Sequence, residues 1–214
     1  CAVMLEPLQG EGGVNVPEEG YLKAVRDWCD QKGILLIFDE IQTGLGRLGT
    51  LFGYQSFEVE PDVMTLAKGL GGGAPIGAFL AKEHASVLEP GDHGSTFGGN
   101  ALTCAAAHAS SKYIVDNNVS EQAGIAGNYL RQELNTLKTK YSQITDVRGM
   151  GMLIGVGFDS DISGQVVAAC TGEGLLLNAV RPNTIRFMPP LTLSVEETDQ
   201  GISKLSNALD KVLT

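Results

Sequence analysis

Two oppositely charged side chains, Asp39 and Lys68, each follow a short apolar segment of the chain. Asp39 comes after the run at 34–38, and Lys68 comes after the run at 63–67. Apolar runs of this kind are typical of strands that are buried on both faces of a parallel sheet. The carboxyl ends of parallel strands share one edge, where open α/β folds bind ligands. We therefore expect the carboxylate and the amine to lie near each other.

A carboxylate and an amine at one sheet edge could serve a cofactor that has an aldehyde and a protonated ring nitrogen. The amine of Lys68 could bond to the aldehyde and later move a proton. Asp39 could keep the ring nitrogen protonated, so that the ring accepts electrons. These are the requirements of pyridoxal phosphate (PLP). Plainer interpretations stay open, because a strand-end Asp often forms a turn and most lysines are surface charges.

The elements that would position this pair alternate between strand and helix. We expect strands at 3–6, 34–38, 63–67 and 76–81, and a helix that opens at Pro17 and stops at Gly33. This alternation predicts a mostly parallel α/β sheet. Helices are expected at 101–115 and 121–141. The segment between Asp39 and Lys68 is rich in glycine, which favours a loop over much of its length.

The pattern changes after the second of these helices. Strands are expected at 144–148, 152–158, 175–178 and 185–188, with helices at 164–171 and 195–212. This order predicts a small α+β unit. We place the boundary near residue 120, so that 1–120 form part of a large α/β domain and 121–214 form the small domain.

Composition excludes several classes of protein. The net charge of −10 argues against a nucleic-acid surface, and no run of eighteen apolar residues predicts a membrane span. The four cysteines and three histidines have no metal-ligand spacing, so no metal is expected and the thiols are those of a cytoplasmic protein. The chain starts at Cys1 in an apolar, strand-like run, which predicts that it is a fragment of a longer protein.

Four motifs together resemble one family. They are EPLQGEGG at 6–13, FDEIQTG at 38–44, AKGLGGG at 67–73 and HGSTFGGN at 93–100. In this order and spacing they are similar to the class III aminotransferases, which are PLP enzymes of fold type I. The similarity covers essentially all 214 residues. It implies part of the large domain of that fold followed by its small carboxy-terminal domain.

The resemblance also implies roles for particular residues. Lys68 matches the lysine that bonds to the cofactor, Asp39 matches the partner of the ring nitrogen, and Gln42 matches a residue near the ring oxygen. Thr96 matches a phosphate-binding residue and Ser95 a residue beside the substrate, both delivered to the neighbouring subunit of a homodimer. Without the family, Gln42 is a polar residue in a turn, and 93–96 is a polar loop.

The resemblance implies a second pair, Arg186 and Glu11. Arg186 matches an arginine that binds a substrate carboxylate, and Glu11 matches the residue that neutralises it when no carboxylate is present. The plainer interpretation of Arg186 is a surface charge at a strand edge. Glu6, at the end of the first expected strand, could simply order the neighbouring loops.

Within the family, the motifs look most like the acetylornithine branch, with the ornithine branch close. That implies transfer of the terminal amino group of N-acetylornithine to 2-oxoglutarate, which gives N-acetylglutamate semialdehyde and glutamate. Ornithine, succinylornithine and 4-aminobutyrate remain alternative donors. A PLP decarboxylase or mutase and a non-catalytic dimerisation module also remain open.

Several parts of the family's site have no counterpart in this sequence. They are the phosphate-binding loop, the aromatic residue that stacks on the ring, and a second substrate-binding arginine. In the family these lie upstream of the position that matches Cys1. We therefore expect the isolated fragment to be inactive.

Overall fold

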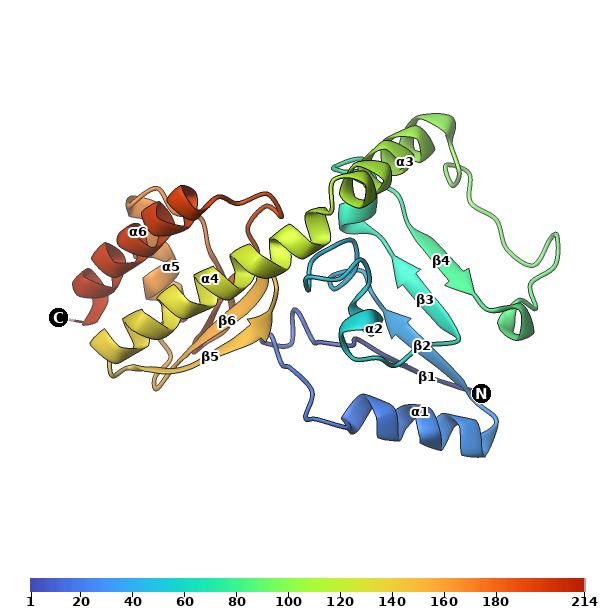
Figure 1. Ribbon diagram of the computed structural model, residues 1–214, viewed down its shortest axis with the longest axis horizontal. Coiled ribbons are helices and arrows are strands. Elements are labelled where there is room, and N and C mark those ends of the chain that lie inside the picture. Colours follow the sequence, from blue (N-terminus) through green and yellow to red (C-terminus); the bar gives the residue numbers. More distant parts are fainter. Residues whose placement is uncertain (214) are drawn as a thin grey trace.

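A computed structural model describes residues 1–213, which form two sheets joined by two long helices (Figure 1). The first sheet has the order β1 (Ala2–Leu5), β2 (Leu35–Asp39), β3 (Val63–Leu66) and β4 (Ala78–Ala81). The first three strands are parallel, and β4 pairs antiparallel with β3. The predicted mostly parallel sheet is confirmed.

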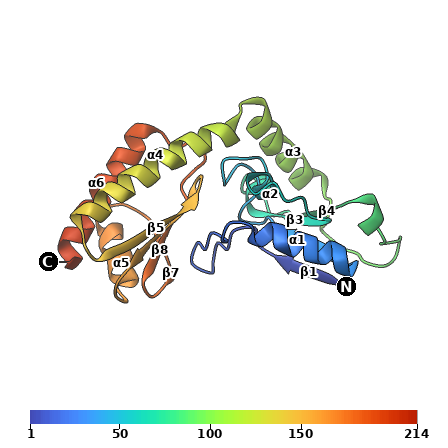
Figure 2. The ribbon, with the colours of Figure 1, turned by 60° about the horizontal axis from the view of Figure 1, so that its bottom comes forward.

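Helix α1 (Tyr21–Lys32) covers the sheet with an apolar stripe and lies beside the strands (Figure 2). Its Leu22 and Cys29 pack against Leu36 and Phe38 of β2. The helix ends at Gly33, whose φ of 63° is a left-handed conformation that glycine adopts at low cost. The predicted start at Pro17 is wrong, because Gly20 has a φ of 80° and interrupts the helical backbone.

Two short helical segments and a long loop follow β2 and β3. Helix α2 (Gly53–Ser56) interrupts the glycine-rich connection, and a 3-10 turn, η1 (Lys68–Gly71), begins at the lysine itself. A second 3-10 turn, η2 (Glu83–Ala85), precedes a segment at 86–100 without helix or strand. Helix α3 (Ala101–Asp116) then begins, and the side chain of Asn100 accepts a hydrogen bond from its first turn.

The second sheet is antiparallel throughout and has the order β5 (Ile144–Met150), β6 (Leu153–Phe158), β8 (Thr184–Phe187) and β7 (Asn178–Arg181). Helices α4 (Val119–Lys140), α5 (Ser163–Gly172) and α6 (Val195–Leu213) pack with it into one apolar core. Alternate residues of the strands point away from this core. On β6 these are Leu153, Gly155 and Gly157.

The strand predicted at 175–178 is wrong, because the strand runs from Asn178 to Arg181 instead. Leu175 and Leu177 pack against the helical core, and Leu176 is 83% exposed. The apolar run at 175–177 is therefore the segment that precedes the strand. Strand β7 pairs with β8 through a tight connection, and a register shift between Ala179 and Arg181 places Asn178 opposite Arg186.

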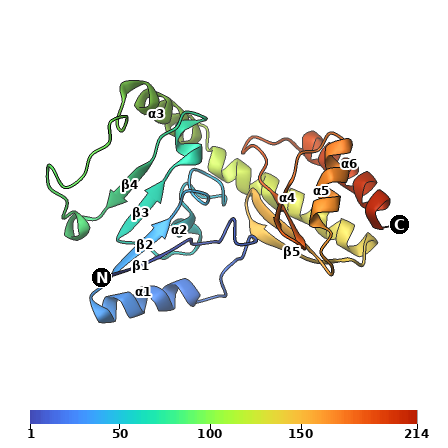
Figure 3. The same cartoon turned by 180° about the vertical axis from the view of Figure 1, so that it is seen from behind.

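The two sheets meet through the segment that follows β1, which extends to the second sheet (Figure 3). Leu8, Val14, Leu48 and Leu153 form a small apolar cluster between the sheets. Beside this cluster, Arg47 donates to the carbonyl oxygens of Met152 (3.1 Å) and Pro189 (2.6 Å).

Backbones also approach closely where α4 crosses the turn between β5 and β6. A Cβ atom at Gly127 would lie 2.1 Å from the carbonyl oxygen of Gly151. Gly151 has a φ of 51°, and a Cβ there would lie 2.5 Å from the carbonyl carbon of Leu48. These two positions therefore require glycine.

The junction between α3 and α4 lies at 117–118, close to the predicted domain boundary. The division at residue 120 stays a prediction. Within the part of the chain that the structure describes, no helix combines the length and apolar character needed to cross a membrane.

Candidate functional site

Asp39 is the last residue of β2 and lies at the carboxyl edge of the first sheet. Its Oδ1 accepts hydrogen bonds from the backbone amide of Ile41 (3.0 Å) and the hydroxyl of Thr65 (3.3 Å), its register partner on β3. In residues 1–213, Oδ2 has no hydrogen-bond partner. One oxygen therefore orients the carboxylate, and the other is available to an N–H group.

Lys68 begins the turn that follows β3, at the same edge of the sheet. Its φ of 44° is left-handed, which for a residue with a side chain costs about 1–2 kcal/mol. The side chain is exposed and lines a hollow of about 300 Å³ together with Gln42, Ser110 and Met188. Unfavourable backbone conformations of this kind persist where the surrounding structure enforces them, and they concentrate at functional sites.

Gln42 lies in the turn after β2 and connects this edge to the second sheet. Its Oε1 accepts a hydrogen bond from Nη1 of Arg186 at 3.1 Å. Because a guanidinium only donates, this contact fixes the amide orientation of Gln42 and leaves Nε2 as a donor. Close packing supports the arrangement, since a Cβ atom at Gly10 would lie 2.5 Å from the same Oε1.

Arg186 is on β8, on the side of the second sheet that faces away from the helices. It is 8% exposed, so the interpretation as a strand-edge surface charge is wrong. Its Nη2 donates to Glu11 Oε1 (3.0 Å) and Asn178 Oδ1 (2.6 Å). Its Nε is buried and has no hydrogen-bond partner. The predicted contact between Glu11 and Arg186 is therefore present, and one donor of the guanidinium is unused.

Sequence reasoning missed Asn178 as a residue of the site. The β7–β8 hairpin aligns it with Arg186 through a register shift between Ala179 and Arg181, which the local sequence does not signal. The error in the predicted strand, which ended at 178, hid this register.

The structure does not bring Ser95 and Thr96 to the other residues of the site. Both are exposed in the 86–100 segment, which extends outward beyond β4 (Figure 1). Ser95 Oγ accepts a hydrogen bond from the amide of Gly98 at 3.0 Å. Their role in a neighbouring subunit stays a prediction.

Two charged residues beside the site, the buried Glu40 and the half-buried Arg47, were not singled out from the sequence. Glu40 is 1% exposed, and burial raises the pKa of its carboxyl group although Thr43, Gly53 and Tyr54 donate hydrogen bonds to it. Burial lowers the pKa of Arg47 to about 10, which leaves it charged at neutral pH. Both residues shape the loop after Asp39.

Glu6 orders a different loop, the one that follows β1, because its Oε2 accepts a hydrogen bond from the amide of Gly10 at 2.8 Å.

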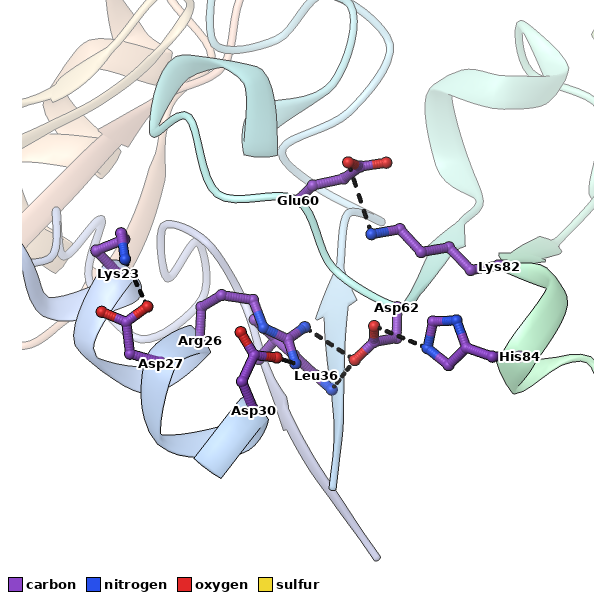
Figure 4. Close-up of polar contacts among 9 residues, drawn as sticks. All are labelled: Lys23, Arg26, Asp27, Asp30, Leu36, Glu60, Asp62, Lys82 and His84. Atoms are coloured by element: carbon purple, nitrogen blue, oxygen red, sulfur yellow. Dashed lines mark hydrogen bonds and ion pairs between the residues drawn. The ribbon is translucent and has the colours of Figure 1, made fainter. Parts of the chain in front are cut away.

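The opposite edge of the first sheet has an ionic cluster around Asp62 (Figure 4). Oδ2 of Asp62 accepts hydrogen bonds from the amide of Leu36 (2.7 Å) and from Arg26 (2.8 Å), and Oδ1 contacts Nε2 of His84 (3.1 Å). Burial alone would raise the pKa of Asp62, but the Leu36 amide and Arg26 outweigh it and lower the pKa. Both oxygens are used, so this cluster holds the strands in place.

No three His, Cys, Asp or Glu side chains in residues 1–213 gather in a way that could hold a metal ion. All four cysteines are free; Cys29 and Cys170 are buried, and Cys1 and Cys104 are exposed.

Comparison with protein families gives one match, to "Aminotransferase class-III", over residues 1–209. Among curated proteins, the chain is 52% identical to the acetylornithine aminotransferase of Clostridium acetobutylicum over 94% of this chain and 52% of that protein. It is 46% identical to the enzyme of the same name from Caldanaerobacter subterraneus, over 99% of this chain and 54% of that protein. The chain thus spans about half the length of the curated relatives it matches.

Solved structures give the same result. The ornithine aminotransferase of Toxoplasma gondii superposes with a TM-score of 0.93 at 39% identity, over 99% of this chain and 51% of that one, and it has PLP at partial occupancy in its active site. The N-acetylornithine aminotransferase of Stenotrophomonas maltophilia superposes with a TM-score of 0.91 at 36% identity, over 100% of this chain and 57% of that one.

Proposed function

Since the chain belongs to the class-III aminotransferase family, we propose that it supplies the covalent lysine and the carboxylate-recognising arginine of a PLP-dependent aminotransferase. The observation that carries this proposal is a hydrogen bond that connects the residues at the edge of the first sheet with the arginine on the second sheet. Asp39 ends β2, Lys68 follows the neighbouring parallel strand β3, and Gln42 connects that edge to the buried Arg186.

The residues at the sheet edge fit PLP. The unused Oδ2 of Asp39 would accept from the ring nitrogen, the exposed amine of Lys68 would bond to the aldehyde carbon, and Nε2 of Gln42 would donate to the ring oxygen. When bound, PLP supplies a protonated ring that withdraws electrons from the substrate carbon. Once the substrate amine has taken its place at the aldehyde carbon, the freed amine of Lys68 would remove a proton from the substrate carbon and return one, as a general acid and base.

The residues around Arg186 fit a reaction with two substrates. The acceptor places a carboxylate at Arg186, whereas the amino donor has no carboxylate at that position. The unused Nε and the Nη2 of Arg186 could bind 2-oxoglutarate bidentately. Glu11, whose side chain is 65% exposed, would leave Arg186 at that moment and return for the amino donor. We propose N-acetylornithine as that donor, with ornithine, succinylornithine and 4-aminobutyrate as the alternatives, and a cytoplasmic location.

An amino-donor series tests this proposal. The chain is purified together with the segments of the site that lie upstream in its relatives, and it is given PLP, 2-oxoglutarate and one donor at a time while glutamate is measured. N-acetylornithine is expected to react fastest. Equal rates with free ornithine contradict the acetyl-specific assignment. Absence of glutamate with every donor contradicts the activity of this chain and favours an inactive fragment or a dimerisation module.

We further propose a homodimer in which Ser95 and Thr96 act in the partner's site. Their exposure and the outward course of the 86–100 segment beyond β4 (Figure 1) support this. Mixing the Lys68→Ala and Thr96→Ala variants should restore activity, because one site of a mixed dimer then has both native residues. Mixtures as inactive as the separate variants contradict the shared site.

A further inference from the structure

The loop at 9–15 lies on the face of the second sheet that is opposite the helices, and it carries Glu11. The loop closes on itself, because Gln9 and Asn15 exchange backbone hydrogen bonds of 3.0 and 3.1 Å. Glu11 lies at its exposed side and reaches Arg186. The backbone of this loop therefore determines whether the carboxylate meets the guanidinium.

Two arginines of the second sheet bind the loop through three consecutive carbonyl groups. Arg148, on β5, donates from Nε to Val14 O (3.1 Å) and from Nη2 to Gly13 O (2.6 Å). Arg181, on β7, donates from Nε to Gly12 O (2.9 Å). Charged donors form stronger hydrogen bonds than neutral ones, so these contacts hold the loop firmly.

The conformation that they hold is an unfavourable one. Val14 has a φ of 56°, which is a true outlier for a β-branched residue. Its side chain is fully buried, and a Cβ atom at Gly155 would lie 3.0 Å from its Cβ. Without its external contacts, the loop would relax toward a more common backbone conformation, and that change would move Glu11.

We propose that Arg148, supported by Arg181, is a positioning residue for substrate selection, because it holds the 9–15 loop so that Glu11 can pair with Arg186. This inference rests on the proposed function. A loosened loop leaves Arg186 without its neutralising partner when the amino donor binds, so the KM of the donor rises. The dicarboxylate acceptor no longer displaces Glu11, so its KM does not rise.

The test compares Arg148→Met and Arg148→Lys with Arg131→Met as the matched control. Arg131 also donates to a backbone carbonyl of β5, Gly149 O at 3.2 Å, but it does not contact the loop. Arg148→Met should raise the donor KM about tenfold, the effect of losing one or two charged hydrogen bonds, and leave the acceptor KM unchanged or lower. Arg148→Lys should raise the donor KM less than Arg148→Met does, and Arg131→Met should change neither KM. Equal changes in both KM values would overturn the proposal.

Hydrogen exchange provides a measurement that needs no turnover. In Arg148→Met the amides of Val14 and Asn15, which are bonded within the loop, should exchange faster while those of α6 keep their rates. Unchanged exchange in the loop overturns the positioning role even if amino transfer is observed. If wild-type protein forms no glutamate, the proposed function fails, whereas the exchange rates still decide whether Arg148 holds the loop.

Discussion

Asp39 and Asp62 lie at opposite edges of the same two strands, and the fold uses them in opposite ways. Asp62 precedes β3 and has partners for both oxygens, from Leu36, Arg26 and His84. Asp39 ends β2, and its contacts occupy one oxygen only. A buried carboxylate with both oxygens bonded stabilises the structure, whereas an oriented carboxylate with an unused oxygen can bind a ligand. The comparison separates a structural charge from a functional one by its hydrogen bonds.

The largest effect is expected from Lys68→Ala, which removes the amine at the functional edge. Loss of proton transfer alone should lower the rate of amino transfer by about 10²–10⁴-fold, and loss of the covalent link should lower it further. Glutamate formation measures this, with Lys112→Ala as the control, since Lys112 only pairs with Asp116 on the surface of α3. Retained activity in Lys68→Ala would remove the basis of the proposed function.

Asp39→Asn should affect activity and leave stability nearly unchanged. The asparagine oxygen can still accept from Ile41 and Thr65, so the loop keeps its hydrogen bonds. The lost negative charge should reduce kcat by about 10²–10³-fold, as for other oriented electrostatic groups. Kinetics and thermal unfolding are measured together; a large fall in the unfolding temperature would assign Asp39 the same role as Asp62.

Asp62→Asn should have the opposite result, with a loss of stability of about 3 kcal/mol, because it removes the buried carboxylate partner of Arg26 and leaves only the exposed Asp30 to pair with the guanidinium. Denaturant unfolding measures this loss. Lys23→Ala, which breaks an exposed ion pair on the same helix, is the matched control and should change stability by less than about 1 kcal/mol. Similar losses in the two variants would contradict the structural role of Asp62.

The pH dependence of stability tests whether the charge of Asp62 is what stabilises the fold. The native pKa of Asp62 is lowered from its ordinary value of 3.8, so its charge contributes stability above that value and loses it as pH falls through the native pKa. The difference in unfolding free energy between wild type and Asp62→Asn should therefore be largest above about pH 5 and narrow in acid. A difference that is constant from pH 7 to pH 3 would show that the charge is not responsible.

Local patterns in the sequence predicted the strands except β7, the ends of most helices and the edge that carries Asp39 and Lys68. Those predictions succeed because buried parallel strands have a strong apolar signature and because strand direction fixes which ends meet. Motif resemblance added the contact between Glu11 and Arg186, which are far apart in the sequence.

Features that depend on distant hydrogen-bond partners could not be predicted in this way. Glu40 is buried because amides thirteen and fourteen residues later donate to it, at Gly53 and Tyr54. The left-handed backbone of Lys68 is likewise enforced by packing around it, since its residue type disfavours that conformation. The contacts of Arg148 depend on carbonyl groups of the 9–15 loop, 134 and 135 residues earlier in the sequence. Such partners are set by tertiary structure, so local periodicity carries no signal for them.

The close approach at Gly127 has a consequence for anyone who redesigns this protein to accept new amines. Exchange of a mid-helix glycine for alanine is an ordinary stabilising step, worth about 1 kcal/mol in an exposed helix. In α4 the added methyl group would collide with the Gly151 carbonyl and force the helix off the turn between β5 and β6. Because the proposed cofactor edge at Asp39 and Lys68 and the proposed substrate-binding Arg186 lie on different sheets, that displacement would misalign the proposed site from a distance. A library for laboratory evolution should therefore keep Gly127 and Gly151 fixed and vary the exposed side of α4.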